Sequence, residues 1–118
     1  MERRQNQASF KAPLVDSPAL HEVVRRLIRA YRPERIYLFG SVARGEAGPD
    51  SDYDLMIVVP DDAPPERHRS RLAYEALWGT GTAADVIVLT ASQFEGRRHV
   101  AASLPATVLR EGKLLHAA

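Results

Sequence analysis

Cysteine is absent from the 118 residues, tryptophan occurs once and methionine twice. Without thiols the chain can form neither a disulfide nor a thiolate metal site. No apolar run approaches the length of a membrane span, and the first 16 residues contain Arg3 and Arg4 but no apolar segment typical of a secretory signal. We therefore expect a cytoplasmic protein that does not bind membranes.

An excess of charge of one sign is also lacking. Sixteen basic and fifteen acidic residues leave a net charge of +1, so the chain has no bulk field that would drive non-specific nucleic-acid binding. We expect no direct nucleic-acid binding. Fourteen of the basic residues are arginine, which suits pairing with phosphate or carboxylate, although genomic composition explains the same bias. The length fits one domain, so a large acceptor would arrive on another molecule.

The N-terminal residues 1–16 show no periodicity and are predicted to be a mobile lead-in, followed by a single domain over residues 17–118. Ser17 and Pro18 are typical of a helix start. Apolar residues then recur at helical spacing as far as Tyr31. We expect an amphipathic helix that ends at Pro33.

Short β-rich runs predict three strands, Arg35–Phe39, Tyr53–Val59 and Asp85–Leu89. The third is nearly all apolar, which is typical of a strand covered on both faces. An apolar stripe predicts a helix over residues 66–78. The predicted alternation of helices and strands indicates an α/β domain with a small β-sheet and flanking helices.

The C-terminal part carries three further signals. Ser92 and Glu95 resemble a capping box at the start of a helix. Pro105 is predicted to open a last helix that reaches Arg110, with Gly112 as its stop. Residues 113–116 are then expected to form a terminal strand.

Asp52 and Asp54 stand two residues apart at the start of the second predicted strand. Side chains at this spacing share a face, about 6 to 7 Å apart at the backbone. Two ionised carboxylates repel by roughly 4 kcal/mol when their oxygens lie about 4 Å apart at an effective dielectric of about 20. Clustered carboxylates are the ligands that Mg²⁺ takes, with water and phosphates in its other positions. The pair therefore predicts a metal site.

Asp85 begins the next predicted strand, after a helix long enough for a parallel crossover. A parallel pair would place it beside Asp52 and Asp54. Three carboxylates can hold two Mg²⁺ about 4 Å apart, as in phosphoryl or nucleotidyl transfer, and Asp85 could act as a general base. The alternative, that Asp85 only caps a strand, is equally compatible with the spacing.

Gly40 and Ser41 close the first predicted strand and can begin a short helix whose free N–H groups face a phosphate. They meet Asp52 only if the first two strands run antiparallel, so we expect a mixed sheet. Arg44 is expected to contact phosphate or to pair with Glu46.

The segment LFGSVARGEAGPDSDYDLMIVV resembles the signature of the DNA polymerase β nucleotidyltransferase superfamily, and most closely its minimal nucleotidyltransferases, which are paired with HEPN-domain proteins. The resemblance implies a palm-like fold that uses Mg²⁺, two ions in all, and a nucleoside triphosphate. It assigns Asp52, Asp54 and Asp85 to the metal and catalytic set. The nucleotide-binding set that it implies is Gly40, Ser41, Arg44 and Ser51, the last two with no specific role.

The same resemblance implies a function. Minimal nucleotidyltransferases of this type are similar to antitoxins that transfer AMP from ATP to a tyrosine hydroxyl of a HEPN toxin. Two alternatives stay open: an enzyme that modifies a small molecule, as aminoglycoside-modifying relatives do with a further helical domain, and a non-catalytic antitoxin that masks its toxin. Tyr74 and Trp78 cover either the core or a partner surface. The four histidines are too dispersed to predict a transition-metal site.

Overall fold

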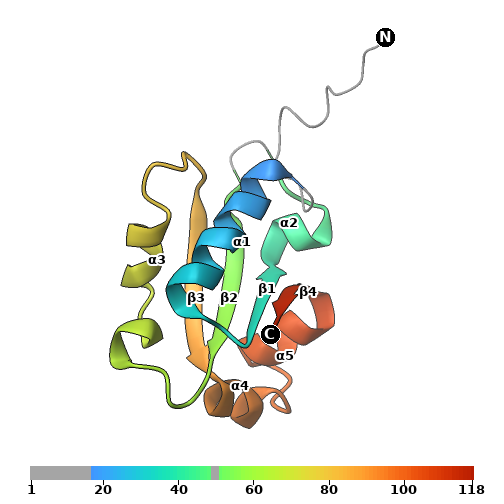
Figure 1. Ribbon diagram of the computed structural model, residues 1–118. Helices are drawn as coiled ribbons and strands as arrows, with labels where there is room; N and C mark the ends of the chain where they lie inside the picture. Colours follow the sequence, from blue (N-terminus) through green and yellow to red (C-terminus); the bar gives the residue numbers. More distant parts are fainter. Residues whose placement is uncertain (1–16, 49–50) are drawn as a thin grey trace.

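A four-stranded sheet forms the centre of the domain (Figure 1). The computed structural model describes residues 17–48 and 51–118, so the predicted lead-in over residues 1–16 lies outside the described residues. The strands are β1 (Arg35–Phe39), β2 (Tyr53–Val59), β3 (Ala84–Thr90) and β4 (Lys113–Ala117), in the order β3-β2-β1-β4. β1 is antiparallel to β2 and β4, whereas β2 and β3 are parallel. The prediction of a mixed sheet is confirmed.

Helix α1 (Pro18–Tyr31) starts as predicted, because the Ser17 hydroxyl accepts a hydrogen bond from the Leu20 N–H at 3.1 Å. Its apolar side chains, including Leu27 and Tyr31, are fully buried. The helix ends at Arg32, whose φ of 46° is left-handed. Pro33 follows and disfavours a helical conformation for the residue before it.

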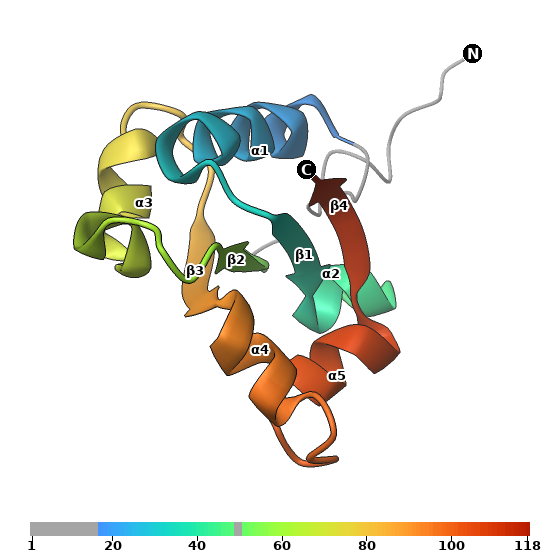
Figure 2. The ribbon, with the colours of Figure 1, turned by 60° about the horizontal axis from the view of Figure 1, so that its bottom comes forward.

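The two faces of the sheet are covered by different helices. Alternate β2 residues such as Leu55 and Ile57 pack against α1 and against Ala73 of α3 (Arg71–Ala76). Met56 and Val58 point the other way, into a cluster with Phe94 of α4 (Ala91–Arg97) and Val108 of α5 (Leu104–Glu111). Figure 2 shows α1 and α3 on one side of the sheet and α4 and α5 on the other. The fold is an α/β layered domain, as predicted.

The helix predicted over residues 66–78 is wrong as a single element. A 3-10 helix, η3 (Pro65–His68), is followed by extended backbone at Arg69 and only then by α3. The Tyr31 hydroxyl donates a hydrogen bond to the Arg69 carbonyl oxygen at 2.5 Å. This long-range bond satisfies the carbonyl outside a helix, and it joins residues too far apart for a local pattern to reveal.

Two predictions about β3 and its following helix also need correction. The capping box of α4 is formed by Thr90 and Gln93 instead of Ser92 and Glu95. Ser92 instead donates its N–H to an Asp61 carboxylate oxygen at 2.8 Å. β3 is not covered on both faces, because Ile87 is 37% exposed. The strand also lies at the edge of the sheet.

The C-terminal elements agree with the predictions apart from their ends. Ser103 caps α5 by accepting a hydrogen bond from the Ala106 N–H at 3.2 Å, and Pro105 lies in the first turn. Gly112 follows the helix, and β4 pairs with β1. None of the helices in the described ranges, 17–48 and 51–118, is long and apolar enough to cross a membrane.

Candidate active site

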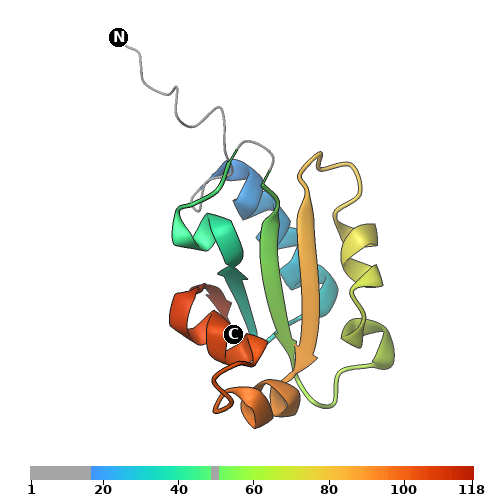
Figure 3. The ribbon, with the colours of Figure 1, turned by 180° about the vertical axis from the view of Figure 1, so that it is seen from behind.

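Three acidic residues lie at one end of adjacent strands. Asp54 is opposite Phe39 in the antiparallel β1–β2 pair and beside Asp85 in the parallel β2–β3 pair. Asp52 precedes Asp54 by two residues and is exposed, as is Asp85. Figure 3 shows this end of the sheet, where α2 (Gly40–Arg44) lies near the start of β2. Helices α4 and α5 lie near the opposite end. The predicted meeting of these residues is observed.

The backbone of Gly40 lies directly against Asp54. Gly40 has a φ of 75°, which is left-handed. A Cβ atom at this position would stand 2.2 Å from Asp54 Oδ2 and 3.0 Å from its Cγ. Only glycine allows both this conformation and this approach of the backbone to a carboxylate. The turn from β1 into α2 is therefore built around Asp54.

The carboxylates influence one another electrostatically. The pKa of Asp54 is raised above its usual value, first by burial and then by the negative charges of Asp85 and Asp52. The positive charge of Arg44 acts in the opposite direction. A partly buried acid between two exposed acids favours a bound cation, which would relieve this repulsion.

The acidic set fits a metal that shares its ligands with substrate. Within residues 17–48 and 51–118, no three His, Cys, Asp or Glu side chains form a ready cage for a metal ion. Mg²⁺ seldom needs such a cage, because it keeps several waters and is bound by one or two carboxylates together with substrate phosphates. Asp52, Asp54 and Asp85 offer oxygen donors of this type, so the predicted metal ligands are chemically suitable.

Helix α2 is held in place by its own buried residues and by an ion pair. Val42 and Ala43 are buried in the core on the α1 side. Arg44 Nε donates to Glu46 Oε1 at 2.9 Å, and its guanidinium also lies 3.6 Å from Glu111. The pairing of Arg44 with Glu46, one of two predicted roles, is therefore observed. Ser41 follows Gly40 at the first turn of α2.

Ser51 forms part of the turn that leads into β2. Its hydroxyl accepts a hydrogen bond from the Gly48 N–H at 2.9 Å, and its own N–H donates to the Gly48 carbonyl at 3.2 Å. Next to it, the hydroxyls of Tyr53 and Ser17 are hydrogen bonded at 2.8 Å. This bond connects the start of α1 to the strand that carries the acids. The nucleotide-binding role of Ser51 stays a prediction.

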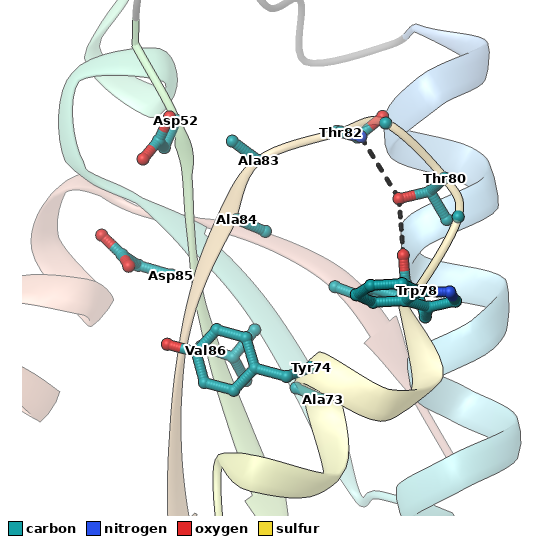
Figure 4. A pocket seen from close by; sticks show the side chains of 13 residues that line it. Asp52, Ala73, Tyr74, Trp78, Thr80, Thr82, Ala83, Ala84, Asp85 and Val86 are labelled. Carbon is teal, nitrogen blue, oxygen red and sulfur yellow. Dashed lines mark hydrogen bonds between the residues drawn. The ribbon is translucent and has the colours of Figure 1, made fainter.

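A cavity of about 520 Å³ adjoins the acids (Figure 4). Asp52 and Asp85 stand at one end, and Tyr74 and Trp78 from α3 and its following loop line another part. Tyr74 is 66% exposed and Trp78 is 85% exposed. The sequence did not decide between core and surface for these two aromatics, and it gave no sign of the cavity.

Comparison with known proteins gives a family match and several structural matches. The family model described as nucleotidyltransferase domain matches residues 20–113. Among curated proteins nothing matches the chain. A crystal structure of a toxin–antitoxin with AMP-PNP contains a chain of similar fold, with a TM-score of 0.54 and 23% identity over 81% of this chain and 72% of that one.

A second similar structure contains a tri-AMPylated Shewanella oneidensis HEPN toxin in complex with an MNT antitoxin. It matches with a TM-score of 0.51 and 20% identity over 85% of this chain and 73% of that one. At such identities the likeness shows a shared fold. It agrees with the mixed sheet and its flanking helices.

Proposed function

We propose, from the premise that this chain belongs to the nucleotidyltransferase domain family, that it transfers AMP from ATP to a hydroxyl of a HEPN-domain partner and acts as its antitoxin. The observation that carries the proposal is the position of Asp54, beside Asp85 in the sheet and against the Gly40 backbone. This arrangement places the turn from β1 into α2 next to clustered carboxylates, which suits a triphosphate and its cation.

On this proposal the donor nucleotide binds at the turn from β1 into α2. The backbone N–H groups at the start of α2, next to the Gly40 turn, are the proposed donors to the phosphate oxygens. The Ser41 hydroxyl adds one donor. Arg44 stays paired with Glu46 and contributes positive potential near Asp54, consistent with its effect on the pKa of that residue.

The proposed metal ligands are Asp52, Asp54 and Asp85. When bound, Mg²⁺ would neutralise phosphate charge and stabilise the leaving pyrophosphate. In the transfer, the acceptor oxygen forms a bond to the α-phosphorus as the bond to the bridging oxygen of pyrophosphate breaks. Asp85 takes the proton from the acceptor hydroxyl and releases it to solvent.

The choice of a protein acceptor has support from the similar structures. One is a toxin–antitoxin with AMP-PNP, and another holds a tri-AMPylated HEPN toxin with its MNT antitoxin. Their shared fold with this chain makes a HEPN-domain toxin the acceptor to test first. No observation on the described residues favours a small-molecule acceptor.

The deciding experiment combines this protein with Mg²⁺, each of the four labelled nucleoside triphosphates and the protein encoded by the neighbouring gene. We expect a mass increase of one or more AMP units on the neighbour, with ATP as donor. EDTA should abolish the increase. No transfer from any nucleotide would contradict the proposal.

A matched pair of variants separates catalysis from masking. Asp52→Asn with Asp54→Asn removes the proposed metal ligands, whereas Asp62→Asn with Glu66→Gln removes two exposed charges elsewhere. We expect only the first variant to lose rescue of cells that express the neighbour. Full rescue by the first variant would favour a masking antitoxin.

A further inference from the structure

The cavity between α3, β3 and their connecting loop, here called the α3–β3 cavity, lies beside the acids. We infer that it receives an extended polypeptide segment of the partner protein, which carries the acceptor hydroxyl, and that Tyr74 and Trp78 are its docking residues. This inference rests on the proposed function, because it assigns the acceptor side of the same site.

The order of the strands sets the direction from which the acceptor approaches the donor phosphate. Gly40 follows β1, Asp54 lies on β2 and Asp85 on β3, and the three positions are neighbours across the sheet. In an in-line displacement the attacking and leaving oxygens stand on opposite sides of the phosphorus. If pyrophosphate leaves on the Gly40 side, the acceptor must enter past Asp85. The α3–β3 cavity is the space that adjoins Asp85 there.

The charge of the cavity selects the class of acceptor. Among the described residues that line it, Asp52 and Asp85 are the charged ones, and none is an arginine or lysine. A nucleic-acid acceptor would find no arginine or lysine in this lining to pair with its phosphates. A neutral or basic polypeptide segment needs no such pairing.

The rim of the cavity has the composition of a protein interface. Tryptophan and tyrosine are the residues most often found as binding hot spots. Trp78 and Tyr74 are 85% and 66% exposed, more than any other large apolar side chain in the described ranges. β3 lies at the sheet edge, with α3 beside it (Figure 1).

The cavity wall is preformed rather than dependent on the partner. The Thr80 hydroxyl donates to the Leu77 carbonyl at 2.9 Å and accepts from the Thr82 N–H at 3.2 Å, as Figure 4 shows. Arg26 of α1 donates to the Trp78 carbonyl at 3.0 Å. Because the loop is already ordered by these bonds, docking costs less conformational entropy.

The single tryptophan of the chain supplies a direct test. 5-Fluorotryptophan incorporated into this protein alone gives one ¹⁹F resonance, from position 78. We expect the resonance to shift when the protein encoded by the neighbouring gene is added, and to stay in place with Mg²⁺ and AMP-PNP alone. A shift caused by the nucleotide alone would overturn the inference, because it would assign the aromatics to the nucleotide base.

A second test uses variants. Tyr74→Ala with Trp78→Ala should lower transfer to the neighbour at least tenfold through a higher KM for that protein, with the KM for ATP unchanged. Leu114→Ala, which truncates a 53% exposed residue on β4, is the control and should transfer at the wild-type rate. Wild-type transfer by the double aromatic variant would overturn the inference.

Failure of the inference is distinguishable from failure of the proposed function. If the wild-type protein modifies its neighbour and the aromatic variant does so equally well, only the docking surface is wrong. If the wild-type protein modifies nothing, the proposed function fails, while the ¹⁹F measurement still reports whether the neighbour docks at Trp78. No shift on saturation with the neighbour would overturn the docking surface.

Discussion

At the scale of single residues, Gly40 is the position with the least tolerance. Its φ of 75° strains any other residue, and its missing side chain leaves room for the Asp54 carboxylate. Gly45, at the end of the same short helix, has a φ of 76° but nothing within 4 Å of an added Cβ. The two glycines therefore share a left-handed backbone conformation and differ in the contact with the acid.

We expect Gly40→Ala and Gly45→Ala each to lower the free energy of unfolding, by about 1–2 kcal/mol from the left-handed backbone. Only Gly40→Ala should also displace the Asp54 carboxylate and reduce nucleotidyl transfer, by about 100-fold. Urea unfolding and the transfer assay measure the two effects separately. Equal activity losses in both variants would show that strain alone, rather than contact with Asp54, is responsible.

Replacement of Asp54 should lower activity without lowering stability, unlike replacement of Gly40. Its burial and its two acidic neighbours raise its pKa and disfavour its charged form. Asp54→Asn removes this repulsion, so we expect a melting temperature in EDTA at or above that of the wild type, with transfer lowered about 100-fold or more. Asp62→Asn, an exposed position, should change neither. A lower melting temperature for Asp54→Asn in EDTA would contradict the repulsion argument.

At the scale of elements, the junction of α5 and β4 is closed around Gly112. An added Cβ would stand 2.6 Å from the Val108 carbonyl oxygen and 2.8 Å from the Leu38 carbonyl oxygen. Both atoms belong to the backbone, so neither can move without shifting α5 or β1. This glycine is needed for space, since its φ of −85° is open to any residue.

We expect Gly112→Ala to lower the free energy of unfolding by about 1–3 kcal/mol through overpacking. Gly96, within α4, has open space around an added Cβ, so Gly96→Ala should raise the free energy of unfolding by about 0.4–1 kcal/mol. Thermal and urea unfolding of the two variants checks both signs. A stable Gly112→Ala variant would show that the α5–β4 junction can open at little cost.

At the scale of the whole molecule, Tyr31 connects α1 to the segment that carries α3. Its side chain is fully buried, and its hydroxyl donates to the Arg69 carbonyl oxygen. Burial raises the pKa of Tyr31 to about 12. A contact with the Ala73 backbone opposes this rise, and the negative charge of Glu75 adds a smaller increase. The folded state therefore holds the phenolic proton more tightly than the unfolded chain.

A raised pKa in the folded state means that this contribution to stability is complete below the unfolded pKa of about 10. It is lost as the pH rises toward the folded value of about 12. We expect the free energy of unfolding to fall across this interval, and to fall less steeply in Tyr31→Phe. At neutral pH that variant should lose about 1 kcal/mol for the hydrogen bond. Identical pH profiles of the wild type and Tyr31→Phe above pH 10 would exclude Tyr31 as the source of the loss of stability.

Binding of the donor should stabilise the whole domain. A ligand that binds only the folded state adds about 2.7 kcal/mol at a concentration 100 times its Kd. We expect ATP with Mg²⁺ to raise the melting temperature and ATP with EDTA to leave it nearly unchanged. The double variant Asp52→Asn, Asp54→Asn should show no magnesium-dependent increase. An equal increase with and without Mg²⁺ would contradict metal-assisted binding.

Much of the site was predictable because its residues follow local rules. Alternation along a strand placed Asp52 and Asp54 on one face, and the crossover to Asp85 required a parallel neighbour. The predicted capping box failed because two candidate pairs, Thr90 with Gln93 and Ser92 with Glu95, lie two residues apart. Where β3 ended decided between them.

The amino-acid sequence by itself determined the strands and their acids, the start of α1 and the family to which the chain belongs. These depend on spacing and on glycine, proline and capping residues, which act over a few positions. Only the tertiary structure decided that β3 lies at an edge, that extended backbone at Arg69 interrupts the predicted helix, and that Tyr74 and Trp78 border a cavity beside Asp85. Each of these depends on contacts between residues distant in the chain, and such contacts form only when the helices pack on the sheet.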